Sequence, residues 1–170
     1  MDESNRYLFI ITGAPGAGKS TLANKIKDNS PKFISPIKEI CEADDYFYII
    51  GHGKYAFDKN LLFKAHSWCQ NKVKREMDEW RNVIVSNTNI IPRDRKVYFD
   101  FAKSHGYKVV YIHLTTDYGT IHDVPDEAVQ RMKDRYIEPS EYEKSLIVKS
   151  GEMDDDLASL LAVCNINYEY

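Results

Sequence analysis

Apolar positions along the chain follow two patterns in turn, and together they predict strands that alternate with helices. Short runs rich in β-branched and aromatic residues are typical of buried strands, and three- or four-residue spacing is typical of amphipathic helices. The predicted strands are 7–11, 37–47 (a strand that enters a polar turn), 82–89 and 107–114. The predicted helices are 20–30, 57–80, 92–106, 125–135 and 152–164.

Residues at the predicted helix ends agree with these boundaries. Asp58 is placed to cap the long central helix, Pro92 stands near the start of the next helix, and Gly106 stands at its end. Alternating strands and helices predict an α/β fold of three layers, in which helices cover both faces of a parallel sheet. We expect a single P-loop kinase domain over 1–170, with a lid at about 115–136 and a helical tail at 138–170.

The segment after the first strand has the form of a phosphate-binding loop. It fits G-x-x-x-x-G-K-[ST] completely and stands between a predicted strand and a predicted helix, which is the required context. Glycines let the backbone approach an anion, and the N–H groups at the helix start then surround it. Lys19 is expected to reach the β- and γ-phosphates, and Ser20 to join the shell of Mg²⁺. The expected nucleotide-binding residues are Gly13, Ala14, Pro15, Gly16, Ala17, Gly18, Lys19, Ser20 and Thr21.

Length, composition and charge limit the classes of protein to which the chain can belong. With 170 residues, of which 43% are apolar, the chain is long enough for one buried core. It has no apolar run near the length of a membrane span and no signal peptide, so we expect a cytoplasmic protein without a membrane partner. The three cysteines lack paired spacing and are expected to be reduced. A net charge of −3 argues against a protein that binds long stretches of nucleic-acid backbone. It does not argue against binding of one nucleic-acid end in a small basic cleft.

Two further polar clusters follow predicted strands, and the carboxyl ends of parallel strands share one edge of a sheet. Phosphoryl transfer to an alcohol needs a carboxylate to accept the hydroxyl proton and cations to spread the charge. Asp44 is favoured as this base over Asp45, although either aspartate also fits an ordinary turn or cap. Asn87 and Asn89 end the third strand. Two roles are equally supported for them: they position the substrate, or they make ordinary hydrogen bonds at a strand end.

Arginines supply the candidate cations. Arg93 opens the fourth predicted helix, and Arg131 and Arg135 share one face of the fifth at i and i+4. Such side chains are often solvated surface charges. A helix that follows a loop over the site nevertheless allows one of them to clamp a phosphate.

Five segments occur in an order that resembles phage-type polynucleotide 5′-hydroxyl kinases and the kinase domains similar to the NEDD4-binding-protein family. They are "GAPGAGKST", "ADDYF", "KAHSWC", "SNTNIIPRDRKVYFDFAKSHGYKV" and "HDVPDEAVQRM", between residues 7 and 135. The resemblance implies ATP as the donor, with Mg²⁺, and a nucleic-acid 5′-hydroxyl end as the acceptor. By matching position, it implies Lys19 and Ser20 as the phosphate and Mg²⁺ residues and Asp44 as the general base.

The chain departs from that family at two places. Tyr46 and Phe47 stand where the family carries an arginine, and Gly119 and Thr120 stand where its lid carries a basic pair. We therefore expect Arg131, with Arg135 as second choice, to replace the missing lid cation. Two alternatives remain: a P-loop kinase of a nucleoside or other small metabolite, and a nucleotide-binding module that has lost catalysis.

Overall fold

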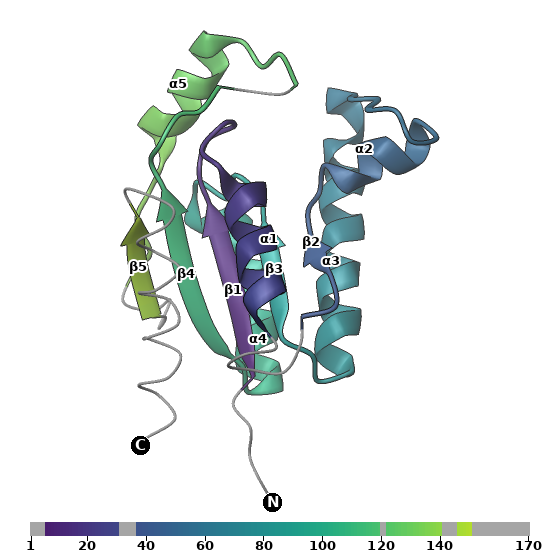
Figure 1. Ribbon diagram of the computed structural model, residues 1–170, viewed down its shortest axis with the longest axis vertical. Coiled ribbons are helices and arrows are strands. Elements are labelled where there is room, and N and C mark those ends of the chain that lie inside the picture. Colours follow the sequence, from purple (N-terminus) through teal and green to yellow (C-terminus); the bar gives the residue numbers. More distant parts are fainter. Residues whose placement is uncertain (1–5, 31–36, 120–121, 141–145, 151–170) are drawn as a thin grey trace, which may run out of the picture.

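The computed structural model describes residues 6–30, 37–119, 122–140 and the backbone of 146–150. Within them a five-stranded, all-parallel sheet has the order β2-β3-β1-β4-β5 (Figure 1). The strands are β1 (Tyr7–Thr12), β2 (Ile40–Cys41), β3 (Val83–Ser86), β4 (Lys108–Leu114) and β5 (Leu146–Ser150). The glycine loop therefore leaves the central strand of the sheet.

Helices cover both faces of this sheet. They are α1 (Lys19–Asn29), α2 (Asp45–Ile50), α3 (Leu62–Asp78), α4 (Pro92–His105) and α5 (Asp126–Arg135), with a 3₁₀ turn η2 (Lys59–Leu61) before α3. In Figure 1, α1 lies in front of the sheet and α4 behind it, while α2 and α5 stand on opposite sides of the edge where the strands end. None of the helices in the described ranges is both long and apolar enough to cross a bilayer.

Alternate residues of each strand feed two separate cores, because successive side chains of a strand point to opposite faces. Leu8 and Ile10 of β1 pack with residues of α3 and α4. Phe9 and Ile11 of the same strand pack with residues of α1. Helix, sheet and helix thus form three layers, and the predicted fold class is confirmed.

The predicted end of α4 is confirmed, and the predicted cap Asp58 lies one short turn before α3, whose own preceding residue is Leu61. The Asp58 side chain accepts a hydrogen bond from the N–H of Asn60 at 2.8 Å, so it caps η2, which leads directly into α3. Gly106 ends α4 with a left-handed φ of 72°, a conformation that suits glycine. Cys41 and Cys69 are buried free thiols, as expected, while Cys164 lies outside the described residues.

Two elements differ from the prediction. The strand expected over 37–47 is limited to Ile40–Cys41, and the aromatic run that follows forms the helix α2 instead. Short apolar runs do not distinguish a strand from one turn of buried helix. The tail was expected to be helical, but Leu146–Ser150 forms β5 beside β4, where its backbone completes the ladder. The helix expected at 152–164 lies outside the described residues.

Candidate functional site

The glycine loop connects β1 to α1 and presents open backbone N–H groups at the start of α1. Gly18 is the residue before the helix and has a left-handed φ of 91°, with no side chain to cap the first turn. The Lys19 ammonium donates hydrogen bonds of 3.0 Å to the carbonyls of Gly13 and of Ala14, so it lies across the loop. A helix N-terminus with free N–H groups and an adjacent ammonium is an arrangement that suits a phosphate group.

Burial lowers the pKa of the Lys19 ammonium to about 8, although the carboxylates of Asp44 and Glu42 oppose this shift. Desolvation disfavours the charged form of a lysine, whereas a nearby anion favours it. The net decrease indicates that the two carboxylates only partly compensate for the loss of water around Lys19. A bound polyphosphate would supply further negative charge at this position.

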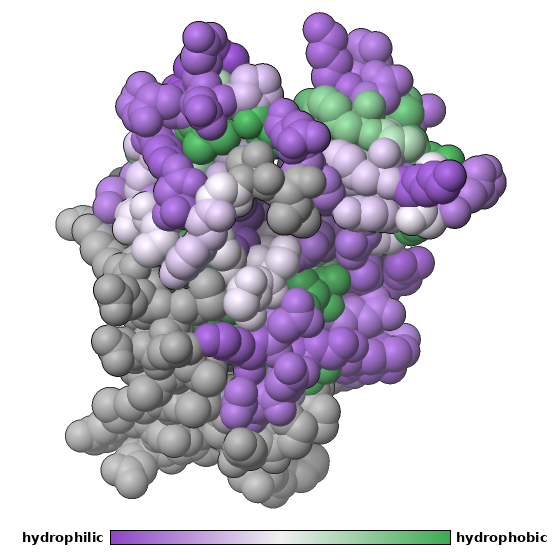
Figure 2. Space-filling view, turned by 45° about the horizontal axis from the view of Figure 1, so that its top comes forward, coloured by the Kyte–Doolittle hydropathy of each residue, from purple (hydrophilic) through white to green (hydrophobic). Residues whose placement is uncertain are grey.

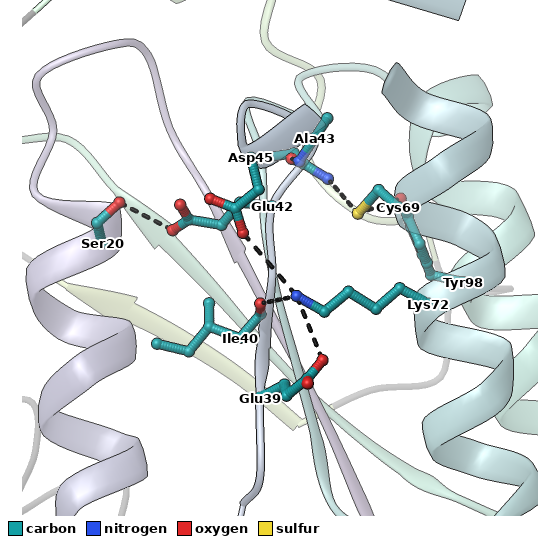
Figure 3. Close-up of polar contacts among 10 residues, drawn as sticks. Ser20, Glu39, Ile40, Glu42, Ala43, Asp45, Cys69, Lys72 and Tyr98 are labelled. Carbon is teal, nitrogen blue, oxygen red and sulfur yellow. Dashed lines mark hydrogen bonds and ion pairs between the residues drawn. The ribbon is translucent and has the colours of Figure 1, made fainter. Parts of the chain in front are cut away.

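Ser20, the next residue, is joined to a carboxylate that the sequence analysis did not identify. Its hydroxyl donates a hydrogen bond of 2.8 Å to Glu42 Oε1, from the segment that follows β2 (Figure 3). Burial raises the pKa of Glu42, and the hydrogen bond from Ser20 opposes this increase. A hydroxyl beside a carboxylate is a pair of oxygen ligands of the kind that Mg²⁺ uses, directly or through water.

Asp44 and Asp45 are adjacent in sequence but have different partners. Asp44 is the exposed residue before α2, and its Oδ1 accepts a hydrogen bond of 3.3 Å from the Tyr55 hydroxyl. Asp45 Oδ2 lies 3.9 Å from the ammonium of Lys72 on α3 (Figure 3). Burial raises the pKa of Asp45, and Lys72 opposes that shift. The Asp44 carboxylate acts to raise the pKa of Lys19, which associates Asp44 with the loop.

Asn87, expected to bind substrate, is 7% exposed and makes its contacts within the fold. Its Oδ1 accepts a hydrogen bond of 2.8 Å from the N–H of Ala43, and its Nδ2 lies 3.6 Å from the Cys69 sulfur. These contacts connect the residue after β3 to the segment after β2 and to α3. The structure thus gives Asn87 a role in holding the two strand ends together.

Asn89 and Arg93 have contrasting surroundings. Asn89 is buried with a left-handed φ of 42°, and its carbonyl accepts a hydrogen bond of 3.1 Å from the fully buried Arg95. The Arg93 side chain is 85% exposed, and its Nε lies 4.0 Å from Oδ1 of the neighbouring Asp94. Binding of substrate by Asn89 or Arg93 remains a prediction.

A cavity of about 320 Å³ lies beside the loop, between it and α5. Its lining comes from the glycine loop, the end of β4, α5 and the residues around them: Ala14, Ala17, Ile90, His113, Leu114, Thr115, Thr116, Met132, Lys133, Tyr136 and Glu138. His113 of β4 stacks on Tyr136, with ring centroids 3.6 Å apart and planes at 4°, which fixes the end of α5 against the sheet.

Arg131 and Arg135, expected to face the phosphates, lie away from this cavity. Successive residues of a helix are turned by about 100°, so residues two apart point in nearly opposite directions. Val129 is buried and Lys133 lines the cavity, which places both exposed arginines on the opposite side of α5. The cation that α5 directs toward the loop in this structure is Lys133, whose ammonium is 3.0 Å from Asp117. In the sequence, Lys133 could have been recognised only as a basic residue two positions from each arginine, on the other face of the same helix.

The segment before α5 is bound to the glycine loop. The N–H of Tyr118 donates a hydrogen bond of 2.8 Å to the Gly16 carbonyl, and the Thr116 hydroxyl donates one of 3.1 Å to the Ala17 carbonyl. Gly16 has a φ of 83°, and a Cβ built on it would lie 2.6 Å from the Gly119 carbonyl oxygen. Close backbone approach therefore requires glycine at position 16, at the contact between the loop and the expected lid.

A protein-family model and a human protein both match most of the chain. The family model described as chromatin associated protein KTI12 matches residues 7–152. Human NEDD4-binding protein 2 is 33% identical over 139 residues, which are 76% of this chain but only 8% of that protein. The resemblance to the NEDD4-binding-protein family is thereby confirmed.

Solved structures agree on the fold. Kti12 of Chaetomium thermophilum, crystallised with ADP-AlF3, has a TM-score of 0.68 at 17% identity, covering 95% of this chain and 97% of that chain. A gluconokinase from Sinorhizobium meliloti has a TM-score of 0.64 at 15% identity, covering 98% of this chain and 96% of that one. With its glycine loop, its parallel sheet and the match over residues 7–152, the chain belongs to the KTI12 family and has a P-loop kinase-like, nucleotide-binding fold.

Proposed function

We propose that this protein transfers the γ-phosphoryl group of ATP to the 5′-hydroxyl end of a nucleic acid. The observation that carries the proposal is that the segment after β2, which holds Glu42 and Asp44, lies against the loop. The Ser20 hydroxyl donates a hydrogen bond of 2.8 Å to Glu42 Oε1, and the Asp44 carboxylate acts to raise the pKa of Lys19. This arrangement supports a cation at the donor phosphate and a carboxylate at the acceptor in one site. Asp44 accepts the hydroxyl proton as that oxygen bonds to the γ-phosphorus, the bond to the bridging oxygen breaks, and ADP leaves.

Mg²⁺ fits the site through Ser20 and Glu42. Ser20 would ligate the ion, and Glu42 would hold a water molecule of its shell, which offsets the lack of an aspartate at position 87. When bound, the ion neutralises charge on the β- and γ-phosphates. The Ser20–Glu42 hydrogen bond supports this assignment, because it already brings the two oxygen groups together.

The choice of a nucleic-acid end depends on the order of the five segments that resemble polynucleotide 5′-hydroxyl kinases. A second candidate, a kinase of a small hydroxylated metabolite, is favoured by the similar fold of the gluconokinase. A third, a binding module without catalysis, is favoured by Asn87, whose side chain is used within the fold where a metal carboxylate is common.

One assay separates these three candidates. The full chain is incubated with Mg²⁺ and γ-labelled ATP in the presence of 5′-hydroxyl DNA, 5′-hydroxyl RNA, nucleosides or gluconate. We expect label on the 5′ end of an oligonucleotide, and none with the Lys19→Ala variant. Label on a nucleoside or on gluconate alone would support the second candidate. Nucleotide binding without transfer to any acceptor would support the third.

A further inference from the structure

Four aromatic rings gather beside Asp44, and we call them the aromatic cluster: Tyr48, Tyr55, Phe57 and His122. Tyr48 belongs to α2, Tyr55 and Phe57 to the loop after it, and His122 to the segment before α5. The hydroxyl of Tyr55 donates to Asp44 Oδ1 at 3.3 Å. The cluster therefore begins one hydrogen bond away from the carboxylate assigned to the acceptor.

Tyr55 and Phe57 lie against the buried ring of Phe47, at centroid distances of 6.0 and 5.2 Å, so the cluster rests on the edge of the core and extends from it to the surface. His122 lies parallel to Tyr55, with centroids 3.7 Å apart and planes at 14°. Phe57 is nearly parallel to Tyr55 at 6.4 Å, and Tyr48 is tilted against it at 5.2 Å. Tyr48 remains 38% exposed and Phe57 54% exposed. Figure 2 shows apolar surface gathered over the part of the molecule that α2 occupies, at the upper right.

We propose that this cluster binds the terminal base of the acceptor, which stacks on Tyr55 in the position that His122 occupies here. The inference rests on the proposed function and names its acceptor site. In a nucleoside, one ribose separates the 5′ hydroxyl from the base. A hydroxyl at Asp44 therefore places the base near the ring whose own hydroxyl contacts Asp44.

The chemistry of the cluster favours a base over a sugar or a packed side chain. Aromatic rings bind single-stranded ends by stacking, with little sequence preference, since every base has a π face. Lys54, in the same loop as Tyr55, is exposed and carries positive charge for a following phosphate. A purely structural cluster predicts instead that Tyr55 affects melting temperature and leaves recognition of the base unchanged.

The test compares ordinary oligonucleotides with oligonucleotides whose 5′-terminal residue lacks its base. With the native protein, we expect the abasic end to raise KM by about ten- to hundredfold. Tyr55→Leu should raise KM for the ordinary end by a similar factor and have almost no further effect on the abasic end. Trp80→Leu, which removes an exposed aromatic residue that follows the far end of α3, is the matched control and should leave both values unchanged.

Binding is measured independently of turnover with 2-aminopurine at the 5′ end and a non-hydrolysable ATP analogue. The fluorescence should be quenched by the native protein and by Trp80→Leu, but not by Tyr55→Leu. His122→Ala should bind the oligonucleotide at least as tightly as the native chain, because it removes a competing ring.

Equal KM values for both ends, or tenfold weaker binding by His122→Ala, would overturn the inference while leaving the proposed function intact. Quenching without phosphoryl transfer to any acceptor would overturn the proposed function and leave the base site standing. Absence of both signals would overturn both proposals.

Discussion

The hydroxyl of Ser20 lies 2.8 Å from Glu42 Oε1, so the residue after the loop lysine is joined to a carboxylate 22 positions away. Asn87 stands where a charged metal partner is common in P-loop enzymes. The Ser20–Glu42 contact supplies a carboxylate from the neighbouring strand end instead. This relationship has a direct consequence for Mg²⁺ dependence.

Glu42→Gln should raise the Mg²⁺ concentration needed for half-maximal activity by about tenfold or more, because outer-shell carboxylates typically tune metal affinity by this amount. Nucleotide affinity without metal should change little. Glu39→Gln is the matched control, since its carboxylate pairs with Lys72 at 3.4 Å. An unchanged Mg²⁺ titration for Glu42→Gln would remove Glu42 from the metal shell.

Lys19 should make nucleotide binding take up a proton in mildly alkaline solution. In the protein without nucleotide, the pKa of Lys19 is about 8, below the ordinary 10.5. The side chain is therefore mostly neutral at pH values well above 8. A polyphosphate favours the charged form and raises this pKa, so binding at about pH 9 recaptures a proton. Calorimetry in buffers of different ionisation enthalpy measures the uptake.

Lys19→Ala should abolish both the proton uptake and phosphoryl transfer, while the melting temperature stays near that of the native chain. The backbone N–H groups of the loop persist without the ammonium. Proton uptake that persisted in the variant would assign the titration to another group.

Asp44→Asn should lower turnover by about 10²- to 10⁴-fold, with little change in ATP affinity, because it keeps the shape of the side chain but loses the basic oxygen. Asp45→Asn is the matched comparison, since its carboxylate is 3.9 Å from Lys72 and contacts α3. Steady-state kinetics on both variants decide the assignment. A damaging Asp45→Asn beside a nearly silent Asp44→Asn would reverse the two roles.

Arg131→Ala and Lys133→Ala distinguish two arrangements of α5. If the helix acts in the position seen here, Lys133→Ala lowers kcat and Arg131→Ala does not, since only Lys133 lines the cavity beside the loop. If α5 turns its other face toward bound phosphates, Arg131→Ala lowers kcat by about 10²-fold or more, and lysine rescues it poorly. If Arg131→Ala and Arg135→Ala both keep the kinetics of the native protein, the hypothesis that one of these arginines binds the phosphates is wrong.

Asn87→Ala should lower the free energy of unfolding by about 1–3 kcal/mol, because it leaves the buried N–H of Ala43 without its acceptor. Nucleotide affinity should change much less than stability. Thr88→Ala, a neighbouring change that keeps the 3.3 Å hydrogen bond from Gly13 to the backbone carbonyl of residue 88, is the control in denaturant titrations. Lost activity at full stability would instead favour substrate binding by Asn87.

Patterns of residues close together in the sequence were sufficient to predict most of the fold. The glycine loop between strand and helix, the spacing of α3, and the ends of α4 at Pro92 and Gly106 all follow from residues close in sequence. The parallel sheet follows from the alternation of elements. Strand β5 and helix α2 were missed because a short apolar run takes its conformation from its neighbours, and those neighbours are distant in sequence.

Residues close together in the chain were enough to predict the loop, the fold class and a pair of aspartates after the second strand. Which side chains meet at the site depends on how the elements pack. The tertiary structure joined Ser20 to Glu42, assigned Asp44 to the loop and Asp45 to Lys72, and turned Lys133 rather than Arg131 toward the cavity. Sheet order and helix rotation fix these contacts, and both depend on packing between segments that no local pattern connects.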